Sequence, residues 1–307
     1  MNVARLQSIL RTAGARAFTV VELLVSISVL ALIVLVLYGL FDQVQKALRG
    51  NVAQVDVMEG GRAGIRLLTT EMEQIKAGGV VNSTNLFIAL SAVPSQQTTL
   101  DPGTNRFNVL DQVYFQSHFN KSWSGTGYRV LLLNTNGIAT DVAEGGVGTL
   151  CRYSVQVNDA DFPYLPLRTG AAGIPATNLF WQVMNSPLGK PPTLNLTNYQ
   201  PVVDGVVHFR VLPYDSNGLL ITNNAITNIP SGFRVLSNAF GNDVEFSYSF
   251  TNQALPTYLD VQLGILDPHI LERYKSYVAP DVAANYLARQ VGAVHLFQVR
   301  IPIHTAP

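Results

Sequence analysis

The chain has 307 residues, of which 48% are hydrophobic and 13% charged, and its 20 basic residues balance its 20 acidic ones. This balance leaves no basic field for a polyanion, so we expect no nucleic-acid partner. Low charge with abundant Asn, Thr, Ser and Gly favours an extracytoplasmic β-rich protein over a cytosolic enzyme. About 230 residues follow the N-terminal segments, enough for one sizeable core or two small ones.

The N-terminus joins a basic stretch to a long apolar one. Residues 1–17 hold no acid and three arginines: Arg5, Arg11 and Arg16. From Val20 to Phe41 only four residues interrupt the apolar run: Glu22, Ser26, Ser28 and Gly39. As a helix, residues 18–41 would be about 36 Å long, enough to cross a bilayer core of about 30 Å. The positive-inside rule places the N-terminus in the cytoplasm and the chain beyond Phe41 outside.

The junction reads Ala17-Phe18-Thr19-Val20-Val21-Glu22-Leu23. It resembles the cleavage motif of type IV prepilins and type II secretion pseudopilins, where Gly usually stands in place of Ala17. The resemblance implies that a prepilin peptidase cuts between Ala17 and Phe18 and methylates the new amine of Phe18. It also implies assembly with other pilins or pseudopilins through the helix, with Glu22 paired to the Phe18 amine of a neighbouring subunit.

Glu22 needs a physical reason, because an unpaired charge in an apolar medium costs at least about 2.5–3.5 kcal/mol. Pairing would make Glu22 determine the register of assembly more than the strength of assembly. The alternative is that its carboxylate extends to the cytoplasmic interface, about a turn from the basic leader. A cleaved secretory signal would have a shorter apolar core. A plain signal anchor remains as an alternative, although it leaves Phe18, Thr19 and Glu22 unexplained.

The helical pattern continues past the apolar run. Apolar residues recur at spacings of three, four or seven as one stripe: Leu40, Val44, Leu48, Val52, Val55, Met58, Ile65, Leu68, Met72 and Ile75. This stripe predicts a single helix from about 18 to about 77 that packs its second half on a folded domain. Four glycines weaken it and are places where it could break or bend: Gly50, Gly60, Gly61 and Gly64. Gly78-Gly79 is the predicted stop.

Beyond Gly79 the apolar period changes to two, which predicts strands. The expected strands contain Val109 to Phe115, Tyr128–Leu133, Leu150–Val157, Val202–Leu212, Val244–Phe250, Tyr258–Leu266 and Val294–Ile303. Residues 122–127 read as a turn-rich loop, and residues 159–201, with six prolines between positions 163 and 192, as a long surface excursion. Residues 267–291 predict two short helices parted by Pro280. Asp215-Ser-Asn-Gly218 is read as a turn, with a partial calcium loop as the alternative.

Three further segments resemble, loosely, the J-type minor pseudopilins of type II secretion. They are Arg66–Gln74 in the stem, Val203–Val211, and the Leu-Pro stretch Leu255–Leu263. The resemblance implies a pilin-like α+β fold with an antiparallel sheet. Membership of a large prepilin-like family is the other possibility that these segments leave open.

No enzymatic motif stands out. The five histidines, at 118, 208, 269, 295 and 304, lack HxH or HxxxH spacing, so structural or surface roles are favoured over metal ligation. The single cysteine, Cys151, lies in a strand pattern and is expected to be a small buried residue that forms no intrachain disulfide. We therefore expect no enzyme, cofactor or metal.

The prediction as a whole is an α+β minor pseudopilin or minor pilin, placed near the filament tip. Its parts are the leader 1–17, the membrane or filament-core helix 18–41, the amphipathic stem 42–78 and the β-rich head 79–307. Before assembly it would be a single-pass inner-membrane protein with a periplasmic head. The alternative from another class is a signal-anchored periplasmic enzyme or binding protein whose site the sequence does not reveal.

Overall fold

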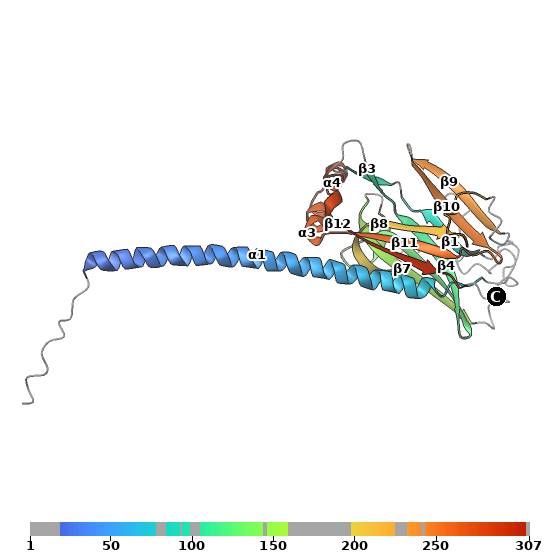
Figure 1. The fold of residues 1–307 in the computed structure, drawn as a ribbon, viewed down its shortest axis with the longest axis horizontal. Coiled ribbons are helices and arrows are strands. Elements are labelled where there is room, and N and C mark those ends of the chain that lie inside the picture. The colour runs from blue at the N-terminus through green and yellow to red at the C-terminus, as the bar shows by residue number, and fades with distance from the viewer. Residues whose placement is uncertain are drawn as a thin grey trace, which may run out of the picture. The chain divides into compact units, whose positions relative to one another are not determined.

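The computed structural model is an α+β protein with an apolar N-terminal helix and a curled antiparallel sheet (Figure 1). It describes residues 19–77, 84–92, 94–98, 105–143, 146–158, 198–224, 232–240 and 243–304. By the density of internal contacts the chain divides into two compact units, Met1–Val52 and Ala53–Pro307. The second unit, which contains the whole sheet, is called the head below.

Helix α1 runs from Val20 to Met72. The helix is unbroken, so Gly50, Gly60, Gly61 and Gly64 do not interrupt it. The predicted end near residue 77 is wrong, because the helix stops six residues before Gly78. Its last hydrogen bonds tighten into a turn, Gln74 N to Glu71 O and Ile75 N to Met72 O. Ile75 then bridges to Ser117 in the sheet, and this pairing takes the backbone out of the helix.

The head is built on a ten-stranded sheet in which every described strand pairing is antiparallel. The order is β12-β11-β8-β7-β5-β4-β1-β10-β9, with β6 beside β5, and β2-β3 form a separate pair. The strands are β1 Thr84–Leu90, β2 Ser95–Thr98, β3 Asn105–Asn108, β4 Asp111–Phe119, β5 Ser122–Leu133, β6 Ala139–Val142, β7 Gly148–Asn158, β8 Gln200–Tyr214, β9 Phe233–Phe240, β10 Asp243–Thr251, β11 Tyr258–Leu266 and β12 Val294–Pro302.

Two helices stand between the last two strands, as the sequence predicted. They are α3 Pro268–Lys275 and α4 Pro280–Leu287, followed by the short 3-10 helix η3 Val291–Ala293. Each of α3 and α4 begins with proline, whose fixed φ suits the first helical turn. Asp267 caps α3 by accepting a hydrogen bond from His269 N at 2.9 Å.

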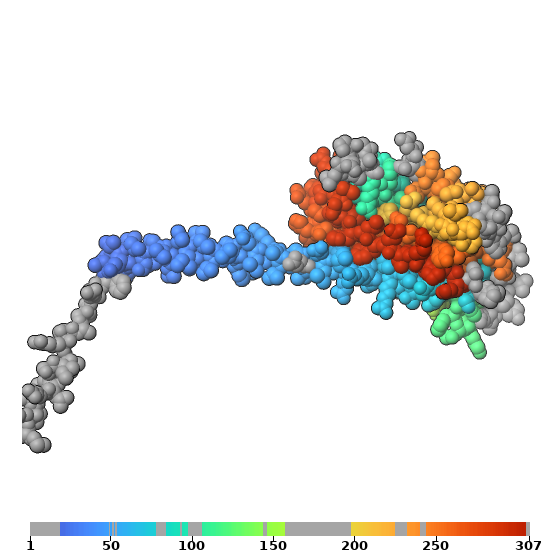
Figure 2. Space-filling model, in the orientation of Figure 1, coloured from blue at the N-terminus to red at the C-terminus, as the bar shows by residue number. Residues whose placement is uncertain are grey.

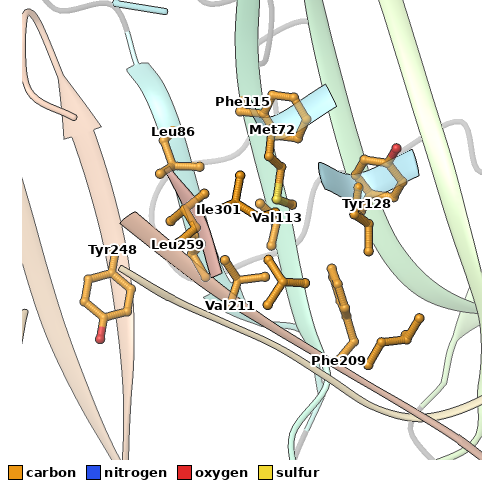
Figure 3. Packing of buried hydrophobic residues seen from close by; sticks show 14 of the residues in the cluster. Met72, Leu86, Val113, Phe115, Tyr128, Phe209, Val211, Tyr248, Leu259 and Ile301 are labelled. Carbon is orange, nitrogen blue, oxygen red and sulfur yellow. The ribbon is translucent and has the colours of Figure 1, made fainter. Parts of the chain in front are cut away.

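The main core lies between the second half of α1 and one face of the sheet. Leu68, Met72 and Ile75 have no exposed surface, and they pack with strand residues such as Val113 and Phe209 (Figure 3). Close approach is possible because α1 presents glycine there. A Cβ atom on Gly64 would lie 2.7 Å from Cγ2 of Val203, and one on Gly61 would overlap the Phe297 ring.

Several strand predictions are confirmed and others corrected. The segment 258–266 forms β11 with the predicted bounds, and 294–302 forms β12. Residues 122–127, read as a loop, are instead the start of β5, and they pair along β4 and β7. Val109 lies just before β4 and not within it.

Strands β1, β2, β3, β6 and β9 were not predicted, because several are short and their apolar alternation is weak. The predicted turn at Asp215 is confirmed: its Oδ1 accepts hydrogen bonds from Asn217 N and Leu219 N. Most of the predicted excursion, residues 159–197, lies outside the described residues.

Candidate functional site

The start of α1 contains the described part of the predicted cleavage and assembly motif. Ala17 and Phe18 lie outside the described residues, whereas Thr19 and Glu22 are described. Thr19 precedes the helix, and Glu22 N donates to its Oγ1 at 3.2 Å. In return, Glu22 Oε2 accepts hydrogen bonds from Thr19 N and Thr19 Oγ1, both at 3.0 Å.

This reciprocal pair is a capping box, in which the residue before the helix and the third helical residue satisfy each other's backbone N–H groups. The Thr-x-x-Glu spacing is present in the sequence, although the sequence-based prediction for Glu22 concerned only its charge. The structure therefore gives this acid a local role that needs no second subunit. A capping carboxylate also lies at the positive end of the helix dipole, where negative charge is favoured.

The first half of α1 is apolar on all sides and has no partner in the described chain. One helical segment, Val20–Leu48, is long and apolar enough to cross a membrane, and its most apolar window has no buried residue. Its two serines do not leave free hydroxyl groups. Ser26 donates to Glu22 O at 2.7 Å, and Ser28 donates to Leu24 O at 2.8 Å. These bonds lower the cost of placing the hydroxyls in an apolar medium.

The stem half of α1 is also fixed to the sheet by a polar contact. Glu71 Oε2 accepts a hydrogen bond from the Tyr128 hydroxyl at 2.5 Å, and the carboxylate pairs with Arg152, whose Nη2 lies 2.7 Å from Oε1. Arg152 Nε adds bonds of 2.9 and 3.1 Å to the two carboxylate oxygens. Burial, and then the Glu71 carboxylate, raise the pKa of Tyr128, so this group remains a donor. The clamp fixes the rotation of α1 on the head.

A second polar group is enclosed within the head. Arg210 Nη2 lies 2.9 Å from Glu245 Oε2, and Asp111 Oδ2 accepts a hydrogen bond from Val211 N at 2.9 Å. Burial raises the pKa of Asp111 to about 8 against the backbone bond that lowers it. Tyr248 lies in the same electrostatic environment, and burial raises its pKa as well. Every one of these groups is mostly enclosed, which favours a structural role over contact with a substrate.

The five histidines are not brought together. His208 is buried: Val109 N donates to its Nδ1 at 3.1 Å, and its Nε2 lies 3.3 Å from Gln262 Oε1. Burial lowers its pKa to about 4, so the ring is neutral near pH 7. Among the described residues no group of three His, Cys, Asp or Glu side chains could hold a metal ion. Cys151 is buried, as predicted, and burial raises its pKa to about 12.

The head has an open cleft of about 660 Å³. Its walls come from the end of β5 and the turn after it, the starts of β7 and β8, and the end of α3. Three of its polar side chains are paired with one another: Asp204 Oδ2 lies 2.7 Å from Lys275 Nζ, and Asp204 Oδ1 accepts from Thr149 Oγ1 at 2.9 Å. The remaining lining is largely aliphatic, so the cleft offers shape more than catalytic chemistry.

Comparison of the chain with protein-family models, with curated proteins and with solved structures finds no match. A functional assignment therefore depends on the motif, on the geometry above and on experiment.

Proposed function

We propose that this chain is a minor pseudopilin or minor pilin, made as a precursor and assembled through its N-terminal helix. Prepilin peptidase removes residues 1–17 by cutting between Ala17 and Phe18, and the new amine of Phe18 is methylated. Before assembly the helix holds the protein in the inner membrane, with the N-terminus in the cytoplasm and the head in the periplasm. The partners are other pilins or pseudopilins, which the apolar half of α1 contacts in a helical bundle.

The observation that carries this proposal is the single helix α1. Its first half exposes apolar side chains on every side, and its second half packs on a β-rich head. The first half needs an apolar medium, which lipid supplies before assembly and neighbouring helices supply after it. A plain signal anchor also explains the apolar half, but it gives no reason for Phe18-Thr19 ahead of Glu22.

The capping box sharpens the role proposed for Glu22. In the precursor its carboxylate accepts hydrogen bonds from Thr19, so the acid is solvated locally although it has no counter-ion. Cleavage creates a positive amine on Phe18, one residue before that partner. The proposal is that the amine of a neighbouring subunit takes the carboxylate during assembly and that mismatched registers leave both charges unpaired.

Two substitutions separate charge from capping. Glu22→Gln removes the charge but retains an oxygen that can cap Thr19, because Glu and Gln both occur at this position of capping boxes. Glu22→Ala removes both. We expect both variants to insert and to be cleaved, and both to be absent from complexes purified through a partner pseudopilin. Normal assembly of the Gln variant would show that the cap, and not the charge, is what the site requires.

Processing is tested by N-terminal sequencing of the protein from membranes. A mature chain beginning at Phe18 supports the proposal, and Ala17→Leu should block the cut, because the position before it requires a small side chain in this family. A chain that retains Met1, or one that begins after residue 35, would overturn it.

The second candidate is a signal-anchored periplasmic binding protein, which the open cleft of about 660 Å³ favours. This candidate predicts that Met1 is retained and that the Glu22 variants behave like the wild type. It also predicts that filling the cleft alters function. Thr149→Trp at the cleft wall, tested beside Ala17→Leu in the same secretion or pilus assay, distinguishes the two candidates.

A further inference from the structure

The α3–α4 hairpin has an apolar tip that nothing in the described chain covers. Val278, between the two helices, is 99% exposed, the highest value among the large exposed hydrophobic residues that the structure describes. Ala279 and Pro280 follow it and are also exposed. Val282, in the first turn of α4, is 45% exposed. Residues 278–280 are consecutive and Asp281 separates them from Val282, so the tip exposes a small apolar cluster whose hydration is unfavourable.

The base of the hairpin is held firmly, so the tip is a fixed feature. Leu271 and Tyr274 of α3 pack with Leu287 of α4 on Leu266 and Val207 of the sheet. The close approach of α3 uses a glycine with positive φ, because a Cβ atom at Gly205 would lie 2.9 Å from Cδ2 of Leu271. Figure 2 shows the hairpin at the surface of the head.

Aromatic and basic side chains surround the tip. The rings of Tyr277 and Tyr286 have centroids 5.2 Å apart, and the Arg273 guanidinium lies 5.4 Å from the Tyr286 centroid. Three acidic and three basic residues between 267 and 291 cancel in charge. Exposed aliphatic groups flanked by Tyr and Arg are typical of the interface between lipid headgroups and acyl chains, where amphipathic rings and long basic side chains collect.

The hairpin lies at the end of the sheet where α1 enters the head. Gly64 of α1 faces Leu263 of β11, and Gly61 faces Phe297 of β12. From Leu263 the strand runs only three residues before it ends at Leu266, and α3 begins at Pro268. The opposite end of the head lies at the other ends of these strands. On β8, Gly205 contacts α3, whereas Tyr214 is nine residues further, or about 30 Å along the strand.

The chain itself limits how far this end of the head can move from the apolar helix. The membrane-length segment ends at Leu48, and the first residue of the head that the structure describes as buried is Val57, nine positions later. Nine residues span about 30 Å at most when fully extended, and about 13 Å as helix. A contact made within such a short connection is intramolecular, so it needs little intrinsic affinity to form.

We propose that the tip of the α3–α4 hairpin, centred on Val278, inserts into the headgroup region of the membrane that holds the Val20–Leu48 segment. This inference rests on the proposed membrane-held precursor. The contact orients the head on the membrane before assembly, and it is lost when the subunit leaves the bilayer. Because the charges of the hairpin cancel, the contact depends on apolar and aromatic groups and not on anionic lipid.

The test uses the full chain reconstituted in vesicles of pure phosphatidylcholine. Single cysteines are introduced as Val278→Cys, Leu219→Cys and Leu30→Cys, and each is labelled with a nitrobenzoxadiazole dye. Quenching at positions 278 and 219 is measured with a lipid that carries a nitroxide near the headgroup, and quenching at position 30 with a lipid that carries the nitroxide on its acyl chain. Leu219 is the matched control, since it is 64% exposed and follows the far end of β8. Native Cys151 is buried, and the labelling of unmodified protein checks that it does not react.

We expect position 278 to be quenched several-fold more strongly than position 219, with the same result when phosphatidylglycerol is added. Position 30 reports on the membrane segment itself. If position 30 is not quenched, the membrane-held form fails, and the proposed function fails with it. If position 30 is quenched while 278 matches 219, the hairpin proposal alone is overturned. A change in dye emission at position 278 that appears only at a high protein-to-lipid ratio, without quenching by the nitroxide lipid, would assign the tip to a second copy of the chain. That result would also overturn the hairpin proposal.

Discussion

The two halves of α1 have the same backbone conformation and opposite surroundings. Between Val20 and Leu48 nearly every apolar side chain is exposed, and none has a partner in the described chain. Between Val57 and Met72 the apolar side chains that face the sheet are buried in the main core. The predicted stripe of apolar residues runs through both halves, but its members up to Val55 are exposed. The difference shows that helical amphipathicity alone does not reveal where the partner of a helix lies.

The comparison predicts that truncating an apolar side chain destabilises the head only in the second half of α1. Leu68→Ala should destabilise the head by about 2–5 kcal/mol, because it removes a fully buried side chain and leaves a cavity. Leu32→Ala, at a site that is 66% exposed, should not change the unfolding of the head. Denaturant unfolding in mild detergent, followed by near-UV circular dichroism, measures both. Equal losses of stability in the two variants would show that both halves of α1 pack on the head.

The stability of the head should depend on pH through two buried groups, His208 and Asp111. His208 has its pKa lowered to about 4, so the unfolded chain binds more protons between pH 4 and 6.5, and this group adds stability as pH rises through that range. Asp111 has its pKa raised to about 8, so the folded chain binds more protons between pH 4 and 8, and this group removes stability as pH rises.

The two effects oppose each other between pH 4 and 6.5, and only the Asp111 effect remains between pH 6.5 and 8. We expect the free energy of unfolding to vary little below pH 6.5 and to fall above it. Asp111→Asn should remove the fall and expose the His208 contribution, which amounts to about 3 kcal/mol between pH 6.5 and 4 at 1.36 kcal/mol per pKa unit. Urea unfolding across pH 4–8 measures this, and a fall above pH 6.5 that persists in the Asn variant would contradict it.

Glycine substitutions sharpen the comparison along the helix. Gly64→Ala places a methyl group 2.7 Å from Val203 Cγ2, and we expect overpacking to cost about 1–3 kcal/mol. Gly60→Ala meets nothing within 4 Å, so it should raise stability by up to about 1 kcal/mol through helix propensity. The pair differs only in contact with the sheet, and thermal unfolding distinguishes them. A stabilising effect of Gly64→Ala would show that the helix does not pack closely there.

The smallest effect is expected at the start of the exposed half. Thr19→Ala removes the capping hydroxyl and should cost about 0.5–2 kcal/mol of local helix stability. Because this part has no contact with the core, the midpoint of head unfolding should not change. Hydrogen exchange should be faster at the amides of the first turn, with Thr19→Ser as the control that retains the cap. Faster exchange in the head itself would contradict the separation of the two halves.

Some features of this protein follow from local sequence. The membrane-length helix, the α3 and α4 pair around Pro280, the turn at Asp215 and strand β11 were predicted because each depends on residues close in the chain, such as apolar runs, prolines and Asx chemistry. The capping box belongs to the same class, since its Thr-x-x-Glu spacing is local, although the prediction for Glu22 rested on its charge alone.

Other features needed the tertiary structure, because distant residues create them. The helix ends at Met72 instead of Gly78, since Ile75 bridges to Ser117 and this pairing outweighs the local helical pattern. Residues 122–127 are a strand although they are rich in Ser and Gly, because β4 and β7 supply backbone partners on both sides. The clamp of Glu71, Tyr128 and Arg152 joins residues up to 81 positions apart. Hydrogen-bond partners and burial at such separations are set by the fold as a whole, and a local pattern of residues does not encode them.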